Sequence, residues 1–166
     1  MTNVTICPVP IEQRPIHEFK ELSQSWFFGM PLTNLRKFYR FLIFSWIIFI
    51  SISILIETGS FYLRNNPTDL ILASLLIGLA LPILLLTTQI LGWNYLLKRL
   101  VSEKIEYEES GWYDGQCWEK PLEWREKDLL IAQHEIKPVI RKLSTSLLCI
   151  TALGIAMSMA MVLKPN

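Results

Sequence analysis

Four side chains that could ligate a metal ion lie far apart along the chain: Cys7, His17, Cys117 and His134. Thiolate and imidazole groups are the usual ligands of zinc, and they also hold haem iron. Such sites commonly take their ligands in closely spaced pairs, and no CxxC pair occurs among Cys7, Cys117 and Cys149. We therefore predict no metal site, and we interpret these residues as unrelated surface and packing positions.

His134 is the remaining candidate for a cofactor ligand. It belongs to the polar segment that leads into the last apolar stretch, where an imidazole could ligate a chlorophyll or a haem at the membrane face. Pigment ligands usually lie deeper, and none of the three long apolar stretches contains a histidine. A solvated helix histidine is the preferred interpretation, so no cofactor is predicted, and chlorophyll or haem is kept as the alternative.

Glu57 and Gln89 are the polar side chains closest to the apolar stretches. Ionisable residues inside membranes are candidates for function, but Glu57 stands at the end of its stretch and is expected to reach water. No repeat relates the apolar stretches, as many transporters would require. No nucleophile, base and orienting group stand at a recognisable spacing, so we predict no catalytic residue.

Aromatic residues crowd the largest polar segment beyond what a small hairpin can bury by itself. Their rings could rest on the membrane interface, cover the neighbouring helix or dock on a partner protein. Interface placement and self-packing are slightly preferred over docking, and all four are kept as partner candidates. The four are Trp112, Tyr113, Trp118 and Trp124.

The elements that must position these residues are dominated by three uncharged stretches. The chain has 166 residues, of which 51% are hydrophobic, and its mean hydropathy is +0.33. The apolar residues concentrate in transmembrane helices predicted over 38–56, 70–97 and 143–163. Pro82 is expected to kink the second span, and Trp93 and Tyr95 suit the interface at its end. The fold class predicted is an all-α membrane protein with three transmembrane helices.

The remaining segments are polar. Residues 1–37 form an N-terminal segment with a short interfacial helix, 57–69 a linker, and 164–166 a tail. The loop over 98–142 alternates apolar and polar residues around two glycines, which predicts a small β-hairpin. An amphipathic helix is expected after Pro121, with an interruption near Pro138.

Small residues recur along the third span. Ala152, Ala156 and Ala160 follow one another at every fourth position, and Gly154 and Ser158 form a second strip. Such strips let another backbone approach closely within a membrane. We predict that the alanine strip is a helix-packing interface.

Basic residues predict the orientation. Fourteen of the sixteen Lys and Arg residues lie before Phe41, where the uncharged run of the first span begins, or within 98–142, which places both segments on the cytoplasmic or stromal side. A net charge of +1 excludes a typical nucleic-acid binder. The N-terminus resembles neither a signal nor a transit peptide, so the chain is expected to be mature as written or made inside its own compartment.

Two blocks carry a family resemblance: CPVPIEQRPIHEFKELSQSWFFGMP and YEESGWYDGQCWEKPLEWREKDLLIAQHEIKPVIRKL. They resemble the family of hypothetical chloroplast reading frame 36, found in algal plastid genomes and cyanobacteria, with nuclear relatives named for conservation in the green lineage and diatoms. The resemblance implies a plastid membrane, the thylakoid first, with a stromal N-terminus, or alternatively a cyanobacterial membrane. It supplies no activity and no catalytic residue.

Three functions remain open on these grounds. The leading hypothesis is a non-enzymatic accessory protein that aids assembly, stability or photoprotection of a photosynthetic complex, with the lipid bilayer and complex subunits as partners. The alternative is a pigment- or haem-binding membrane protein, and a membrane enzyme is the weakest of the three. The sequence does not set the oligomeric state.

Overall fold

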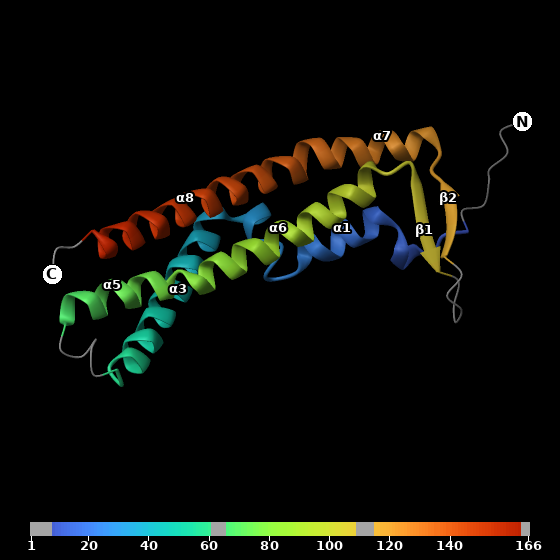
Figure 1. Ribbon diagram of the computed structural model, residues 1–166. Helices are drawn as coiled ribbons and strands as arrows, with labels where there is room; N and C mark the ends of the chain where they lie inside the picture. The colour runs from blue at the N-terminus through green and yellow to red at the C-terminus, as the bar shows by residue number, and fades with distance from the viewer. Residues whose placement is uncertain (1–7, 61–65, 109–114, 164–166) are drawn as a thin grey trace, which may run out of the picture. The chain divides into compact units, whose positions relative to one another are not determined.

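The computed structural model describes residues 8–60, 66–108 and 115–163, which form two compact units. The unit built from Thr33–Leu91 and Arg141–Asn166 is called the membrane unit, because it holds most of the apolar sequence. The unit built from Met1–Leu32 and Gly92–Ile140 is called the polar unit. Figure 1 labels the longer helices and the two strands.

Long helices make up the membrane unit. They are α3 (Leu35–Glu57), α5 (Pro67–Gly78), and the parts of α6 (Ala80–Val101) and α8 (Lys137–Val162) that fall within it. α3 begins where the Asn34 side chain accepts a hydrogen bond from the amide of Lys37 at 3.1 Å, which satisfies one of the free amides of the first turn.

Among the described residues, three helical stretches are long and apolar enough to cross a membrane. They are Leu35–Glu57, Pro67–Val101 and Leu122–Val162. A stretch of about 20 apolar residues spans the hydrocarbon core, so each suffices. The predicted fold class, an all-α membrane protein with three transmembrane helices and a small hairpin, is confirmed.

The second stretch is divided at Leu79 into α5 and α6. Pro82 has no amide hydrogen for the carbonyl of Gly78, so regular α-helical bonding cannot continue through this turn. The Leu79 amide bonds instead to the carbonyl of Leu76, at 3.2 Å. This frees the carbonyl of Leu75, which accepts a hydrogen bond from Trp46 Nε1 of α3 at 3.4 Å.

The polar unit contains short elements and the predicted hairpin. Strands β1 (Lys104–Glu108) and β2 (Gly115–Glu119) pair antiparallel, with Ile105 opposite Trp118. Ile105 and Tyr107 of β1 form a small core with Val9, and Trp118 packs against it. The N-terminal helical elements of this unit are η1 (Ile11–Gln13), α1 (Pro15–Gln24) and α2 (Met30–Thr33), and the end of α6 leads into the hairpin.

A wide helical turn replaces the interruption expected near Pro138. Helix α7 (Leu122–Ile131) passes into a π-helical turn, η2 (Ala132–Ile136), which passes directly into α8. The Lys137 amide bonds to the carbonyl of Ala132, five residues back. Proline cannot donate to the preceding turn, and a π-helical turn rearranges the bonding locally so that the helix continues.

Candidate functional site

An apolar groove in the membrane unit is lined by side chains from several of its helices. Its volume is about 720 Å³, within the range of roughly 300–1,000 Å³ typical of ligand sites. Tyr39, Leu42, Ile43 and Trp46 come from α3, Leu79 and Pro82 from the α5–α6 junction, and Arg141, Lys142, Thr145, Ser146, Cys149, Ile150 and Leu153 from α8.

The division at Leu79 gives the groove part of its wall. Leu79 and Pro82 are both buried and both line it. Trp46 is fixed beside them, because its indole nitrogen bonds to the freed carbonyl of Leu75. The proline therefore removes a helical hydrogen bond and also orients an aromatic wall residue.

Polar side chains gather at the α8 start of the groove. The hydroxyl groups of Tyr39 and Ser146 lie 3.1 Å apart and link α3 to α8. Arg141 and Lys142 precede Ser146 by about one turn, and both are exposed. Within the described part of the chain, neither side chain forms an ion pair. The groove thus combines apolar walls with two available cations at one end.

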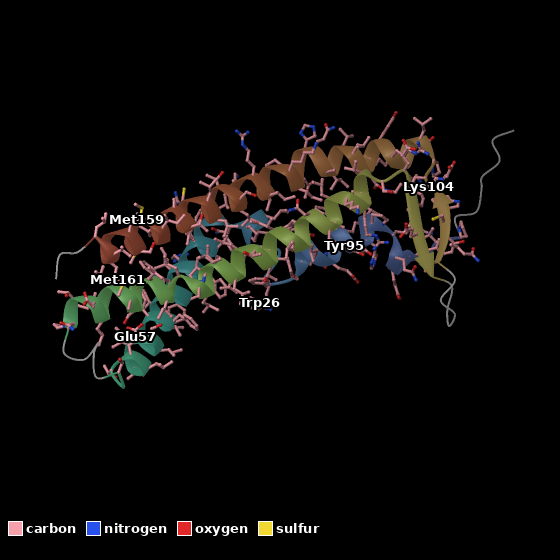
Figure 2. All side chains as sticks on the ribbon, viewed as in Figure 1. Trp26, Glu57, Tyr95, Lys104, Met159 and Met161 are labelled. Carbon is pink, nitrogen blue, oxygen red and sulfur yellow. The ribbon has the colours of Figure 1, made fainter. Side chains whose placement is uncertain are left out.

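A buried carboxylate lies elsewhere in the membrane unit. Glu57, labelled in Figure 2, stands at the end of α3 and is 7% exposed. Its Oε2 accepts a hydrogen bond from the hydroxyl of Ser74 in α5 at 2.5 Å, a length typical of a hydroxyl on a carboxylate. Its Oε1 is buried with no hydrogen-bond partner among the described residues. The expectation that Glu57 reaches water is wrong, since α5 covers it.

The polar unit has its own buried charge, Lys120. The ammonium group donates to the carbonyls of Arg99 and Leu100, each at 3.0 Å, and to Asp128 Oδ2 at 2.7 Å. The three bonds use all three of its hydrogens. Because the two carbonyls belong to the last turn of α6, Lys120 closes that helix end and joins it to α7.

Arg99 makes the second link within the polar unit. Its guanidinium pairs with Glu18 of α1 and donates to the carbonyl of Gln13 at 3.1 Å. The same guanidinium lies 5.9 Å from the ring centre of Tyr95, which is 64% exposed (Figure 2). These contacts hold the N-terminal segment of this unit against α6. They place no side chain for catalysis.

The two described aromatic candidates contact each other. The rings of Trp118 and Trp124 lie 5.5 Å apart in an edge-to-face arrangement. The Arg14 guanidinium lies 5.4 Å from the ring centre of Trp124. Both rings are partly covered by their own unit. Trp112 and Tyr113 lie outside the described residues.

The remaining candidates are dispersed. His134 is exposed on the π-helical turn, and Cys117 is exposed on β2. His17 Nδ1 lies 3.6 Å from Glu21 Oε1, one turn along α1. Within 8–60, 66–108 and 115–163 no three His, Cys, Asp or Glu side chains are placed to hold a metal ion. Cys7 lies outside these ranges.

The alanine strip is uncovered. Ala152, Ala156 and Ala160 are all exposed on α8, whereas Gly154 and Ser158 are partly covered. A Cβ atom built on Gly154 would lie 3.5 Å from Leu79 Cδ1, an ordinary contact distance. Gly154 therefore faces the rest of the membrane unit, and the alanine strip is left without a partner among the described residues.

Sequence reasoning missed the groove and Lys120. The groove residues come from three separate segments of the chain. The sequence of each segment by itself predicts only an ordinary lipid-facing helix. A usable signal was the adjacent pair Arg141 and Lys142 directly before an uncharged stretch. For Lys120, no local pattern distinguishes it from the other basic residues of its segment.

Comparisons with known proteins agree over most of the chain. Residues 7–149 match the family model described as CGLD27-like, Conserved in the green lineage and diatoms 27. An uncharacterized protein ycf36 of Porphyra purpurea is 33% identical over 150 residues, which are 90% of this chain and 91% of that protein. The ycf36 protein of Cyanophora paradoxa is 34% identical over 143 residues, 86% of this chain and 90% of its own length.

A longer relative shares the same region. The Arabidopsis thaliana protein named Conserved in the green lineage and diatoms 27, chloroplastic, is 36% identical over 141 residues. The match covers 84% of this chain and 43% of that protein. No solved structure matches significantly.

Proposed function

This chain belongs to the CGLD27-like family, and on that premise we propose that it is a non-enzymatic accessory protein of a photosynthetic membrane in the plastid. It aids the assembly, stability or photoprotection of a photosynthetic complex. The thylakoid is the membrane proposed, with the N-terminus and the 98–142 segment in the stroma. The chloroplastic relative in Arabidopsis thaliana and the three apolar helical stretches support this location.

The uncovered face of α8 is the observation that carries the proposal. None of the most apolar part of the Leu122–Val162 stretch is buried by the described chain, against 17% for Leu35–Glu57 and 28% for Pro67–Val101. The strip of Ala152, Ala156 and Ala160 lies on this helix, exposed. Small residues favour helix pairing in lipid because they let backbones approach closely. A helix of a partner subunit therefore packs on this strip.

The two described aromatic candidates are less suited to partner binding. Trp118 is packed against the core of Val9, Ile105 and Tyr107, and Trp124 is packed between Trp118 and Arg14. Rings already used within their own unit would have to leave these contacts to anchor a partner. We therefore assign partner binding to the alanine strip of α8.

Affinity purification tests the assignment. The tagged chain, recovered from mildly solubilised membranes, is expected to carry subunits of a photosystem or a cytochrome complex. Ala156→Leu, which adds bulk at the middle of the strip, should abolish this recovery. Thr88→Leu is the matched control, because Thr88 is exposed on α6 and bonds only to its own helix in the described structure.

Two results would refute the proposal. One is recovery of the chain alone from wild-type membranes, together with normal complex levels in a deletion strain. The other is equal recovery of subunits with Ala156→Leu and with Thr88→Leu, at matched amounts of protein. A purified protein whose absorption spectrum shows bands beyond those of Trp and Tyr would favour a pigment or haem binder instead.

A further inference from the structure

We propose that the apolar groove of the membrane unit binds one anionic glycerolipid. The acyl chain lies along the apolar walls, and the negatively charged headgroup lies against Arg141 and Lys142. This assignment is independent of the accessory role proposed above, because it concerns only residues of the membrane unit and a component of the bilayer.

The apolar walls match an acyl chain. Leu42, Trp46, Leu79, Pro82, Ile150 and Leu153 line the groove away from its charged end. Five of these six side chains are purely hydrocarbon, and the indole nitrogen of Trp46 is already bonded to the Leu75 carbonyl. The walls thus offer no unsatisfied polar atom that a hydrocarbon chain would bury.

The charged end matches an anionic headgroup. Arg141 and Lys142 directly precede the uncharged stretch 143–163, so their side chains reach the depth of the lipid headgroups. Both are exposed and free of ion pairs within the described chain. The Ser146 hydroxyl donates to the carbonyl of Lys142 at 2.9 Å and lies 3.1 Å from the Tyr39 hydroxyl, so both hydroxyl groups are already bonded within the unit. The guanidinium and the ammonium group together suit a phosphate or sulfonate group.

Apolar walls together with a basic end fit a lipid better than they fit a partner helix or a chlorophyll. A partner helix packed into the groove would cover two cations unless it carried matching acids at the same depth, where acids are rare. A chlorophyll is usually ligated within the membrane by a histidine, and none is present among the described residues that line the groove. An anionic glycerolipid supplies both an apolar chain and a negative charge at the required end.

Lipid binding to the purified full-length chain tests the proposal. The chain is delipidated in a non-ionic detergent and titrated with dioleoyl phosphatidylglycerol or dioleoyl phosphatidylcholine, and bound lipid is counted by native mass spectrometry. We expect one phosphatidylglycerol molecule to bind to each chain. Its affinity should be higher than that of phosphatidylcholine. Arg141→Gln with Lys142→Gln should weaken phosphatidylglycerol binding by about 25-fold, since each basic residue near an anionic lipid contributes roughly a fivefold effect.

Two further variants distinguish lipid binding in the groove from general attraction between basic residues and anionic lipid. Lys127→Gln with Lys137→Gln removes two exposed basic residues outside the groove and should leave the affinity unchanged. Cys149→Trp places a bulky ring at the groove wall and should prevent binding of either lipid at this site. Because Arg141, Lys142 and Cys149 are all exposed, each variant is expected to unfold at the wild-type temperature.

Three outcomes would overturn the proposal. They are equal affinity of the wild-type chain for the two lipids, unchanged phosphatidylglycerol affinity after Cys149→Trp, and equal losses in the two double variants. The first comparison uses only the wild-type chain, so it decides the matter even where a variant fails to fold. None of these measurements depends on recovery of a photosynthetic complex.

Discussion

Gly78 of α5 and Ile50 of α3 approach so closely that a Cβ atom on the glycine would overlap Ile50 Cγ1. The same atom would lie 3.1 Å from Trp46 Nε1. Ile50 is β-branched and holds one rotamer within a helix, so it cannot turn away cheaply. The contact therefore sets how closely α3 and α5 pack.

Replacing Gly78 by alanine should destabilise the membrane unit by about 1–3 kcal/mol through overpacking. Gly154→Ala is the matched control, because its Cβ would meet only Leu79 Cδ1 at 3.5 Å. The control is expected to be neutral or slightly stabilising, since alanine favours helix. Thermal unfolding in detergent, followed by circular dichroism, measures both. Equal stability of the two variants would contradict the close packing.

Removing the Ser74 hydroxyl should destabilise the chain by about 1–3 kcal/mol. Ser74→Ala leaves Glu57 Oε2 buried without its donor, and Oε1 already has no partner among the described residues. Ser51→Ala removes an exposed hydroxyl that bonds within its own helix, and it should change stability by less than about 0.5 kcal/mol. Urea titration in detergent compares them. A Ser74→Ala variant as stable as Ser51→Ala would show that the contact is unimportant.

Breaking the buried ion pair of the polar unit should have the largest effect. Lys120→Met leaves Asp128 and two helix-terminal carbonyls without their donor, at a cost of about 3–5 kcal/mol. Lys127→Met, on the exposed face of α7, should be near neutral. Protease resistance of the polar unit is the measurement. Adding Asp128→Leu to Lys120→Met should recover part of the loss, and no recovery would contradict the pairing.

Cysteine labelling tests which segments leave the membrane. Cys117 is exposed on β2, whereas Cys149 is exposed within the uncharged stretch 143–163. In a Cys7→Ser background, a membrane-impermeant maleimide should label Cys117 from the stromal side of intact membranes. Cys149 should react only after detergent is added. Lipid shields its thiol in intact membranes, and the thiolate that reacts with maleimide forms only in contact with water. Equal labelling rates in intact membranes would contradict the predicted span.

Hydropathy alone predicted the spanning helices, because removal of long apolar stretches from water dominates their energetics. Aromatic positions were predicted less well. Trp93 and Tyr95 both suited the interface, and Tyr95 is 64% exposed, but Trp93 is completely buried and lies 6.4 Å from the Phe19 ring. The difference comes from α1, whose contact with α6 no local pattern indicates.

The groove and the Lys120 cluster depend in the same way on distant segments. Arg141 was visible as one end of an uncharged stretch, but Trp46 and Pro82 become its neighbours only after three helices pack. Lys120 and Asp128 read as two charges in a nearly neutral segment, and the α6 carbonyls that hold Lys120 lie about twenty residues earlier in the chain. Side-chain patterns along one element cannot supply such pairings.

The π-helical turn at Ala132–Ile136 also sets the direction in which the helical side chains after it point. An α-helix advances by about 100° for each residue, and a π-helical turn takes up one residue more than an ordinary turn. Deleting Gln133 would let the turn close as regular α-helix while keeping Asp128 opposite Lys120. The residue count of this turn therefore fixes the direction, around the helix axis, of the side chains that follow.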